Sequence, residues 1–439
     1  MTDASQGQAR AIPIGRTARA TRLGGAGLSI AGNVALSGAR ELLGGRRPDL
    51  RGLMLTPANI QRLTTELARM RGAAMKVGQL ISMDAGDMLP PEVAQIIARL
   101  RADADFMPPK QLRDVLDTHW GPGWMTRFQR FNVRPIAAAS IGQVHEAIDK
   151  SGRHLAIKVQ YPGVKASIDS DVSNVGALVR MSGIIPKGLD LKPLLEEAKR
   201  QLHDEADYNR EATELTRFHT WLAGDARFAV PGLEPALSGT DVLAMDYIKA
   251  APVEVVEDAS QDDRNRVTAL LFELTLRELF ELGHMQTDPN FANYRYQSDT
   301  GRLVLLDFGA ARPVPRETAE AYRTMLRALM AHDRAGMDAG ALALGVYAPE
   351  TDAIHKTAIL DLMEQGLTGI DADGVFDFGH KALRQELAQQ GAHLAEDQKF
   401  LHIPPMDTLY VQRKLAGMFL LAARLRARIN LRALFEPYL

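Results

Sequence analysis

The sequence predicts an α+β fold with two lobes, a strand-rich lobe followed by a mainly helical one. Short apolar segments of strand character recur in the middle of the chain, at 128–133, 143–149, 154–160, 228–230 and 241–247. A long helical segment at about 190–224 separates the first three of these strands from the last two. From about 262 the pattern is helical, interrupted only by a loop at 287–293 and a turn at 298–301. This order of elements indicates two unequal lobes.

The region before the first strand predicts helices. Thr56-Pro57 offers a capping hydroxyl followed by proline at the first helical position. Apolar residues then recur at three- and four-residue steps to about residue 84, which predicts one long amphipathic helix. Two further helices are expected near 91–101 and 109–119. A helical extension therefore precedes the strand-rich lobe.

Four short motifs occur in the order that a phosphate-transfer site requires. They are AAASIGQVH at 137–145, AIKVQ at 156–160, TDPNFAN at 287–293 and LLDFGAA at 305–311. Asp288 and Asn293 are five residues apart, the Asp-to-Asn interval of a kinase catalytic loop. Asp307 begins a DFG triplet 19 residues after Asp288. Together the motifs predict a nucleotide site of the protein-kinase type, and hence a bilobal protein-kinase-like fold.

The second motif places Lys158 inside a short apolar strand, where an ammonium group needs an anionic partner. In a kinase-like site this lysine binds the α- and β-phosphates of ATP and is held by an acid from the following helix. The acids on that predicted helix are Glu205, Asp207, Glu211 and Glu214. At about 100° per residue the last three share a face, whereas Glu205 points about 200° away from Asp207. One face can serve Lys158, which leaves Glu205 for a different partner.

The third and fourth motifs predict the metal-binding and catalytic residues. Asp307 would chelate a metal that bridges the phosphates, and Asn293 would supply a second oxygen ligand. Hard oxygen donors of this kind suit Mg²⁺. Asp288 would orient the attacking hydroxyl or water. Met245 and Tyr247 lie where the hinge between the lobes is expected, with backbone groups free to bond adenine.

The first motif is an unusual phosphate loop. Kinases use several glycines there so that backbone amides can approach phosphate, whereas this chain has Ala137, Ala138 and Ala139, followed by Ser140. Gly142 is the glycine that remains. Because alanine penalises positive φ, the loop should be stiffer and should hold a triphosphate differently.

Composition narrows the functional classes. The 439-residue chain has a net charge of −2, which argues against general nucleic-acid binding, and it has no cysteine for disulfides, thiolate chemistry or metal ligation. Both ends are nevertheless basic. Residues 1–51 carry eight arginines, and the basic residues of 411–432 are Arg413, Lys414, Arg424, Arg426, Arg428 and Arg432. Both ends could therefore lie on an anionic membrane. No signal peptide is evident and no apolar stretch reaches the ~20 residues that span a bilayer, so a soluble or peripheral protein is expected.

These residues together resemble the UbiB family of atypical protein-kinase-like ATPases, in particular the branch that supports coenzyme Q (ubiquinone) biosynthesis. The resemblance covers roughly 56–435. It rests on Lys76-x-Gly78-Gln79, the alanine loop, AIKVQYPGV at 156–164, Glu205-x-Asp207, QTDPNFANY at 286–294 and the DFG triplet. It implies that the N-terminal helices pack over the active-site cleft, where Lys76 and Gln79 meet Glu205 and Asp207. It also implies that Lys158 pairs with Glu211.

The same resemblance implies a function and partners. The expected activity is ATP hydrolysis with Mg²⁺, in support of membrane-associated ubiquinone synthesis. Expected partners are ATP/ADP, anionic membrane lipids, and quinone-precursor lipids or quinone-biosynthesis proteins, without nucleic acid; a homodimer is a further possibility. UbiB itself ends in transmembrane segments, which are missing from this sequence. The expected location is therefore the cytoplasm, with peripheral attachment to the membrane.

Three alternatives stay open at this point. A protein kinase is disfavoured because a helical pattern at 315–330 follows the DFG triplet almost at once and leaves little room for an activation segment. A small-molecule phosphotransferase would carry His two residues before the catalytic Asp, where this chain has Gln286. A nucleotide-gated lipid-binding module without turnover is the third. The expected domains are a basic arm at 1–55, the helical extension at 56–127, a small lobe at 128–250 and a helical large lobe at 251–439.

Overall fold

The structure is a computed structural model that describes residues 106–139, 141–181, 192–367, 374–380, 402 and 404–439, together with the short strand β1 (Thr2–Asp3). Contacts between Cα atoms divide the chain into two compact units. Among the described residues, the first unit holds those up to Ala212 and Gly232–Tyr247. The second unit holds Thr213–Pro231 and the residues from Ile248 onward.

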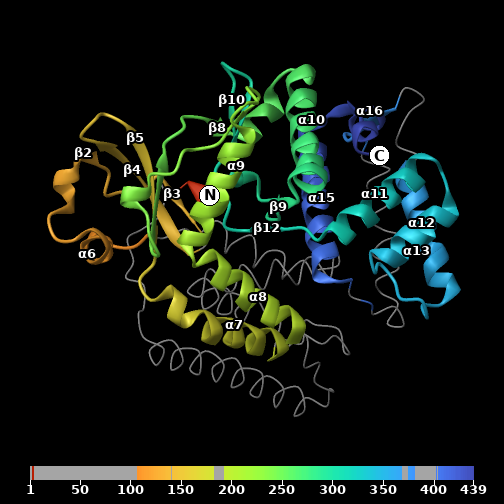
Figure 1. Ribbon diagram of the computed structural model, residues 1–439, viewed down its shortest axis with the longest axis horizontal. Helices are drawn as coiled ribbons and strands as arrows, with labels where there is room; N and C mark the ends of the chain where they lie inside the picture. The colour runs from red at the N-terminus through yellow and green to blue at the C-terminus, as the bar shows by residue number, and fades with distance from the viewer. Residues whose placement is uncertain are drawn as a thin grey trace, which may run out of the picture. The chain divides into compact units, whose positions relative to one another are not determined.

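An antiparallel sheet is the frame of the first unit (Figure 1). Its strands follow the order β1, β3 (Ala137–Ala138), β4 (Gly142–Asp149), β5 (His154–Gln160) and β7 (Val242–Asp246), and β2 (Phe128–Phe131) pairs with β4. Strand β5 is buried along all but its first residue, which explains its apolar run. The strands expected at 128–133, 143–149, 154–160 and 241–247 are confirmed.

Helix α6 (Pro109–Trp120) packs into the core of this unit. Proline at its first position suits a helix start, as the sequence predicts. Leu112, Leu116 and Trp120 recur every four residues and are buried in one cluster with Trp124 and with side chains of the sheet. The sequence analysis assigned this helix to the N-terminal extension, but its apolar face belongs to the core of the strand-rich unit.

Three further helices follow the sheet strands, where the sequence pattern predicts only one. Helix α7 (Val164–Met181) was not expected. The predicted helix at 190–224 is broken into α8 (Lys192–Glu205) and α9 (Tyr208–Leu222). The Asp207 carboxylate causes the break, because it accepts from the N–H groups of Asn209 and Arg210 and so caps α9. The angular comparison of Glu205 with Asp207 along one continuous helix was therefore wrong.

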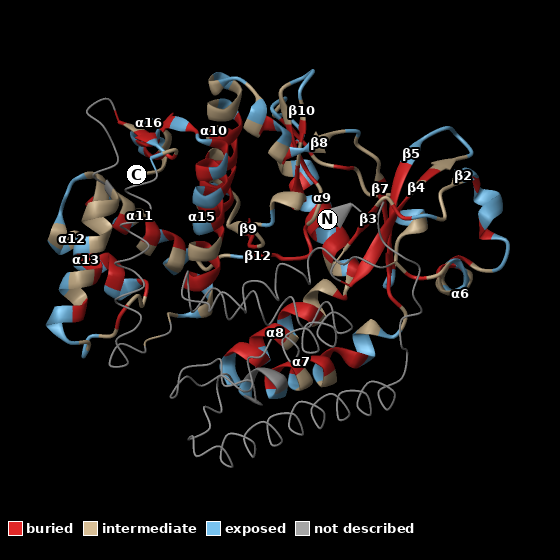
Figure 2. Cartoon of the chain, turned by 180° about the vertical axis from the view of Figure 1, so that it is seen from behind, coloured by how far each residue is buried: buried red, intermediate tan, exposed pale blue. Residues whose placement is uncertain are grey.

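Helices make up most of the second unit, as predicted. They are α10 (Gln261–Arg277), α11 (Arg316–Met330), α12 (Arg334–Ala343), α13 (Ala353–Leu367), α15 (Met406–Leu425) and α16 (Leu431–Phe435). The hydroxyl of Ser260 accepts from the N–H of Asp263 and begins α10. Helices α10 and α15 contact each other, and Figure 2 shows buried residues along both of them. Their shared interface forms part of the core of this unit.

Short strands interrupt the second unit more often than the sequence pattern predicts. One sheet has the order β6 (Phe228–Ala229), β11 (Arg302–Leu305), β10 (Tyr294–Gln297) and β8 (Ala251–Pro252). Two further ladders join β9 (His284–Gln286) to β12 (Ala311–Pro313) and β13 (Val375–Asp377) to β14 (Arg428–Asn430). Strand β6, expected beside the small-lobe strands, pairs in parallel with β11 instead. Strands of two to four residues are too short for periodicity to identify.

Candidate nucleotide-binding and catalytic site

A short hairpin in the second unit brings the predicted metal ligands to one end of two strands. Tyr294 of β10 lies opposite Leu305 of β11. The next pair continues the pattern, because the N–H of Leu306 donates to the carbonyl of Asn293 at 3.1 Å. Asp307 follows directly. The register of this hairpin therefore places Asn293 and the start of the DFG triplet side by side.

The β9–β12 ladder fastens the other end of the same two loops. Gln286 lies opposite Ala311. Thr287 donates to the carbonyl of Ala310 from its N–H at 3.3 Å and from its hydroxyl at 2.9 Å. Asp288 comes next in the chain. The catalytic loop and the DFG segment are thus held to each other at both ends, mainly by backbone pairing.

The Gln286 side chain connects the two loops between the ladders. It is buried, and its Oε1 accepts from the N–H of Asp288 at 2.6 Å. Its Nε2 donates to the carbonyl of Asp307 at 2.7 Å. Its own N–H donates to the buried carboxylate of Glu278. One glutamine therefore fixes the backbone on both sides of the predicted site.

The Asp288 carboxylate is held by two side chains. Its Oδ1 lies 3.0 Å from Nη2 of Arg413, and its Oδ2 lies 3.3 Å from Nδ2 of Asn293. The same Asn293 amide also donates to the Asp288 carbonyl at 3.4 Å. Because the nitrogen of this amide faces Asp288, its Oδ1 faces away from it, as a metal ligand would require. The arrangement orients Asp288 and Asn293 together.

The DFG triplet is anchored by its middle residue. Phe308 is buried against Phe218 of α9, with 4.9 Å between ring centroids. Oδ1 of Asp307 accepts from the N–H of Gly309 at 3.0 Å, which closes a tight turn. Helix α9 also carries Glu211, seven residues and so two turns before Phe218. The same helix thus supplies partners for two of the predicted motifs.

In the first unit, Lys158 forms a buried ion pair. Its side chain is 4% exposed, and its Nζ lies 2.6 Å from Oε1 of Glu211, which is 2% exposed. The ring of Tyr208 lies 5.6 Å from the same ammonium group. Glu211 stands in the first turn of α9, where the helix dipole favours a negative charge. This is the pairing that the family resemblance implied.

The alanine loop is a hairpin between β3 and β4. Ala137 and Ala138 are buried strand residues opposite Val144 and Gln143, and the N–H of Ala139 donates to the carbonyl of Gly142 at 2.9 Å. The described non-glycine residues with positive φ are His332 and Arg426, and both lie outside this hairpin. The three alanines therefore adopt backbone conformations that alanine accepts, and the stiffness of this loop stays a prediction.

Gly142 is required by space at the base of this hairpin. A Cβ atom there would lie 2.4 Å from the carbonyl oxygen of Val159 and 2.9 Å from the hydroxyl of Tyr208. The backbone of β4 can therefore approach β5 and α9 only with glycine at this position. The glycine that remains in the motif serves packing beside the Lys158 pair.

A buried polar chain supports strand β4 next to the alanine hairpin. Oε1 of Gln143 accepts from the N–H of Met107, and its Nε2 lies 2.8 Å from Nε2 of His145. Nδ1 of His145 donates to the carbonyl of Asn132 at 2.8 Å. Burial lowers the pKa of His145 to about 4, so the ring is neutral and can accept from Gln143. This series of hydrogen bonds attaches the backbone of Met107 to the sheet.

The hinge expectation needs correction. The N–H of Asp246 donates to the carbonyl of Gly232, and the N–H of Tyr247 donates to the carbonyl of His154, both at 2.9 Å. Met245 is a buried residue of β7. These two amides are therefore bonded within the first unit and are not free to bond adenine. The sequence pattern shows a strand here but not which groups its neighbours occupy.

A second buried charge cluster lies beneath the catalytic loop. Lys414 is fully buried, with its Nζ 2.6 Å from the hydroxyl of Tyr294 and 3.4 Å from Oε2 of Glu278. Burial raises the pKa of Glu278 to about 7, against the opposing pull of Lys414. Burial alone would lower the pKa of Lys414, but Glu278 and Tyr294 raise it above its ordinary value. The cluster fixes α15 against β10 and against the segment that directly follows α10.

Part of the family motif lies outside the described residues. These positions are Lys76, Gly78 and Gln79, and Ser140 of the alanine loop is also outside. Glu205 is the last residue of α8, and Asp207 caps α9. The expected meeting of the Lys-x-Gly-Gln helix with these two acids stays a prediction.

Of the six basic residues at the C-terminal end, Arg413 and Lys414 point into the protein, whereas Arg424, Arg426, Arg428 and Arg432 are exposed, so membrane contact by this end stays a prediction. The Arg413 side chain is 8% exposed and pairs with Asp288, and the fully buried Lys414 pairs with Glu278. Arg424 pairs with Glu257, and Arg428 lies 3.6 Å from Asp377. The partner acids come from distant parts of the chain, so the absence of acids within 411–432 was misleading. The basic arm at 1–51 lies outside the described residues.

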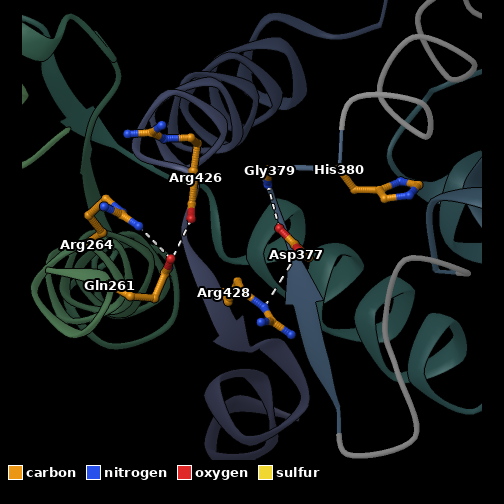
Figure 3. Close-up of a pocket in the computed structure, with 7 residues that line it drawn as sticks. All are labelled: Gln261, Arg264, Asp377, Gly379, His380, Arg426 and Arg428. Carbon is orange, nitrogen blue, oxygen red and sulfur yellow. Dashed lines mark hydrogen bonds and ion pairs between the residues drawn. The ribbon is translucent and has the colours of Figure 1, made fainter. Parts of the chain in front are cut away.

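One open cavity of about 440 Å³ lies elsewhere in the second unit (Figure 3). Arg264, Arg426 and Arg428 line it together with Asp377. Figure 3 shows the guanidinium groups of Arg426 and Arg428 pointing in different directions, and Arg428 is paired with Asp377. None of the described site residues lines this cavity. Its charges do not converge on one point, so the geometry assigns no ligand to it.

Sequence reasoning missed two residues of the site. Gln286 attracted notice only because it stands where some phosphotransferases carry His, and Arg413 was counted as a surface charge. A usable signal for Arg413 was its place, with Lys414, inside the otherwise apolar helix α15, since charges there need partners. The contact with Asp288, 125 residues away, has no sequence signal.

Fold and site together define a kinase-like, nucleotide-binding class of protein. The buried lysine–glutamate pair lies on a strand and helix of the strand-rich unit, and the catalytic loop and DFG triplet lie in the helical unit, as in protein kinases. A solved structure of the same type is that of Rv3197 with erythromycin from Mycobacterium tuberculosis. It has a TM-score of 0.61 and 25% sequence identity, and the alignment covers 86% of this chain and 95% of that one.

Residues 99–340 match the family described as the ABC1 atypical kinase-like domain. The chain belongs to this family of atypical kinases, which confirms the UbiB resemblance. It is 35% identical to "Atypical kinase COQ8, mitochondrial" of Saccharomyces cerevisiae, over 97% of this chain and 85% of that protein. It is 37% identical to "Atypical kinase COQ8B, mitochondrial" of Rattus norvegicus, over 97% of this chain and 81% of that protein. The kinase-like fold class predicted from the sequence is likewise confirmed.

The relatives are named as mitochondrial proteins. Within the described parts of this chain, no helix combines the length and the apolar character needed to cross a membrane.

Proposed function

We propose that this chain is an ATP-hydrolysing atypical kinase that requires Mg²⁺ and supports membrane-associated ubiquinone biosynthesis. The observation that carries the proposal is the pair of ladders that holds Asp288 and Asn293 against Asp307. The two ladders and the Gln286 side chain fix these three residues relative to one another, as expected for residues that act in one site. Membership of a family whose named relatives are atypical kinases COQ8 supports the same conclusion.

Nucleotide binding is assigned to the first unit. Lys158, held in place by Glu211, would bind the α- and β-phosphates of ATP. Ala137, Ala138 and Ala139, with Ser140 next in the sequence, would bind the phosphates from above. Adenine would lie beside Met245 and Tyr247, bonded by groups other than the amides of Asp246 and Tyr247.

The residues present fit a magnesium ion. Asp307 offers a carboxylate and Asn293 an amide oxygen, which are the hard donors that Mg²⁺ prefers, with phosphate oxygens and water to complete the shell. When bound, the metal neutralises phosphate charge and orients the phosphates for attack. The Asn293 amide is already turned toward this task, because its nitrogen is committed to Asp288.

Asp288 is proposed to orient the attacking water. Its carboxylate is held at both oxygens, and its backbone N–H is held by Gln286. A group fixed in this way can position a water molecule for in-line attack at little entropic cost. Hydrolysis in place of protein phosphorylation is proposed because the family resemblance implies that the segment with Lys76, Gly78 and Gln79 would meet Glu205 and Asp207 and keep a protein substrate out.

The client and location belong to the same proposal. The client would be a quinone-precursor lipid or a quinone-biosynthesis protein. The basic arm at 1–51 would bring the protein to an anionic membrane as a peripheral cytoplasmic protein. The division at 1–55, 56–127, 128–250 and 251–439 is proposed with it, and a homodimer is compatible with it.

The test is ATP turnover measured with three vesicle preparations and a phosphorylation control. The vesicles are neutral, cardiolipin-containing, and cardiolipin-containing with a quinone-precursor mimic, and a peptide library with labelled ATP is run alongside. We expect Mg²⁺-dependent turnover that rises with anionic vesicles and the mimic, without peptide phosphorylation. Peptide phosphorylation at the rate of ATP consumption would favour a protein kinase instead. ATP binding without turnover would favour a nucleotide-gated binding module.

A further inference from the structure

Arg413 reaches the catalytic loop from a helix that lies far from it in sequence. It is part of α15, and its Nη2 lies 3.0 Å from Oδ1 of Asp288. The Arg413 side chain is 8% exposed and that of Asp288 is 20% exposed. An ion pair with so little solvent is screened weakly, and loss of one partner leaves the other charge uncompensated. The contact is therefore strong enough to hold the carboxylate in one orientation.

The helix that carries Arg413 is fixed against the same loop. One turn further along α15, a Cβ atom on Gly417 would lie 2.1 Å from Cβ of Pro289, the residue after Asp288. The helix backbone therefore contacts the loop directly. Lys414, the next residue after Arg413, is locked by Tyr294 and Glu278. These contacts oppose rotation and sliding of α15. The position of Arg413 is therefore set before any ligand binds.

The two oxygens of Asp288 are thereby distinguished. Oδ1 takes the guanidinium of Arg413 at 3.0 Å, whereas Oδ2 has the longer 3.3 Å contact with the amide of Asn293. We propose that Arg413 is a positioning residue for the reaction, which holds Oδ1 so that Oδ2 faces the attacking water. This inference rests on the proposed function, since it assigns Asp288 the orienting role. Without Arg413 the carboxylate is held only by the longer contact with the Asn293 amide, so its two oxygens can exchange places more readily.

The test separates kcat from KM. Arg413→Ala should lower kcat for ATP hydrolysis by about 10- to 100-fold, the scale expected when a positioned group is misplaced. The KM for ATP and the affinity for Mg-ATP should stay within about twofold, because Arg413 belongs to none of the proposed phosphate or metal contacts. Added guanidine should restore part of the lost kcat by filling the vacated site. A variant of the exposed Arg327 on α11, Arg327→Ala, should keep the kcat of the parent.

Two further variants keep the inference open to contradiction. Arg413→Lys retains the charge without the planar fork, so it should fold and still lose kcat. In an Asp288→Asn background, Arg413→Ala should change the residual turnover by less than about twofold, because the residue that it positions is already altered. A multiplicative loss in that background, or unchanged kcat in Arg413→Lys, would overturn the role. If the parent itself hydrolyses no ATP, the proposed function fails instead; an active parent with an equally active Arg413→Ala contradicts this inference alone.

Discussion

The side-chain amide of Gln286 donates to the backbone carbonyl of Asp307 across 2.7 Å. The same side chain accepts from the N–H of Asp288 at 2.6 Å. A single buried side chain thus bonds the backbone of the proposed metal ligand and that of the proposed orienting residue. Any shift of one loop is transmitted to the other, so the relative placement of these two carboxylates depends on residue 286.

We expect Gln286→Leu to destabilise the second unit and to impair catalysis. Leucine leaves the Asp288 N–H and the Asp307 carbonyl without this partner in a partly buried place, at a cost of about 1 kcal/mol for each group. Urea unfolding and ATP turnover measure the two effects. The control is Gln297→Leu on β10, which removes an exposed hydrogen bond to the carbonyl of Lys249. Equal stability losses in both variants would contradict the bridging role.

The buried Glu278 should make stability depend on pH. Burial raises its pKa from 4.5 to about 7 in the folded state. The folded protein therefore keeps a proton that the unfolded chain releases, and this contribution is full below about pH 4.5 and is lost as pH rises through about 7. Lys414, whose pKa is raised, loses its contribution only at strongly alkaline pH.

The measurement compares the parent with Glu278→Gln in urea unfolding at about pH 5 and about pH 8. Glutamine cannot titrate, so the stability of the parent should fall relative to the variant as pH rises. A stability difference between parent and variant that stays constant over this interval would show that Glu278 is already ionised in the folded protein at about pH 5.

Sequence patterns predicted the elements that have a clear local signal, such as an apolar run or a proline at a helix start. The apolar run of β5 revealed a buried strand, and the proline at the start of α6 revealed a helix. Helix α7 escaped notice because serines, aspartates and an asparagine weaken its apolar periodicity. The break before α9 escaped because it depends on one capping residue, Asp207, in a stretch that otherwise favours helix.

The candidate site was predictable where its residues lie close in sequence. The spacing of Asp288, Asn293 and Asp307 was enough to identify the two loops that the ladders bring together. The contacts of Arg413 and Lys414 were not predictable, because their partners are acids far away in the sequence. A charge count along the chain cannot tell a buried ion pair from a surface that binds anions.

Gly417 gives a test of how closely α15 must approach the catalytic loop. Gly417→Ala places a Cβ atom 2.1 Å from Pro289, so either the helix or the loop must move. We expect a loss of about 1–3 kcal/mol in stability, typical of overpacking, together with slower turnover. Gly366→Ala in α13 is the matched control, since it meets nothing within 4 Å and should gain about 0.5–1 kcal/mol. Normal turnover in Gly417→Ala would show that catalysis does not depend on the close approach of α15 to the catalytic loop.

Ala139→Gly tests the stiffness of the alanine hairpin. Ala139 closes the turn to Gly142 with an ordinary backbone conformation, so glycine there should cost about 0.4–1 kcal/mol by adding freedom to the unfolded chain. A looser hairpin should also change the relative affinities for ATP and ADP. Calorimetric titration with both nucleotides checks this. Affinities identical to those of the parent would show that the hairpin does not control nucleotide preference.

The central claim is that Asp307 binds the metal and Asp288 serves the reaction. Titration of Mg-ATP into Asp307→Asn and Asp288→Asn, with turnover measured on the same samples, tests it most directly. We expect Asp307→Asn to lose Mg²⁺-dependent nucleotide binding, because Mg²⁺ loses its only charged protein ligand in the proposed site. Asp288→Asn should bind Mg-ATP like the parent and lose turnover. Parent-like affinity in Asp307→Asn, or parent-like turnover in Asp288→Asn, would contradict the account.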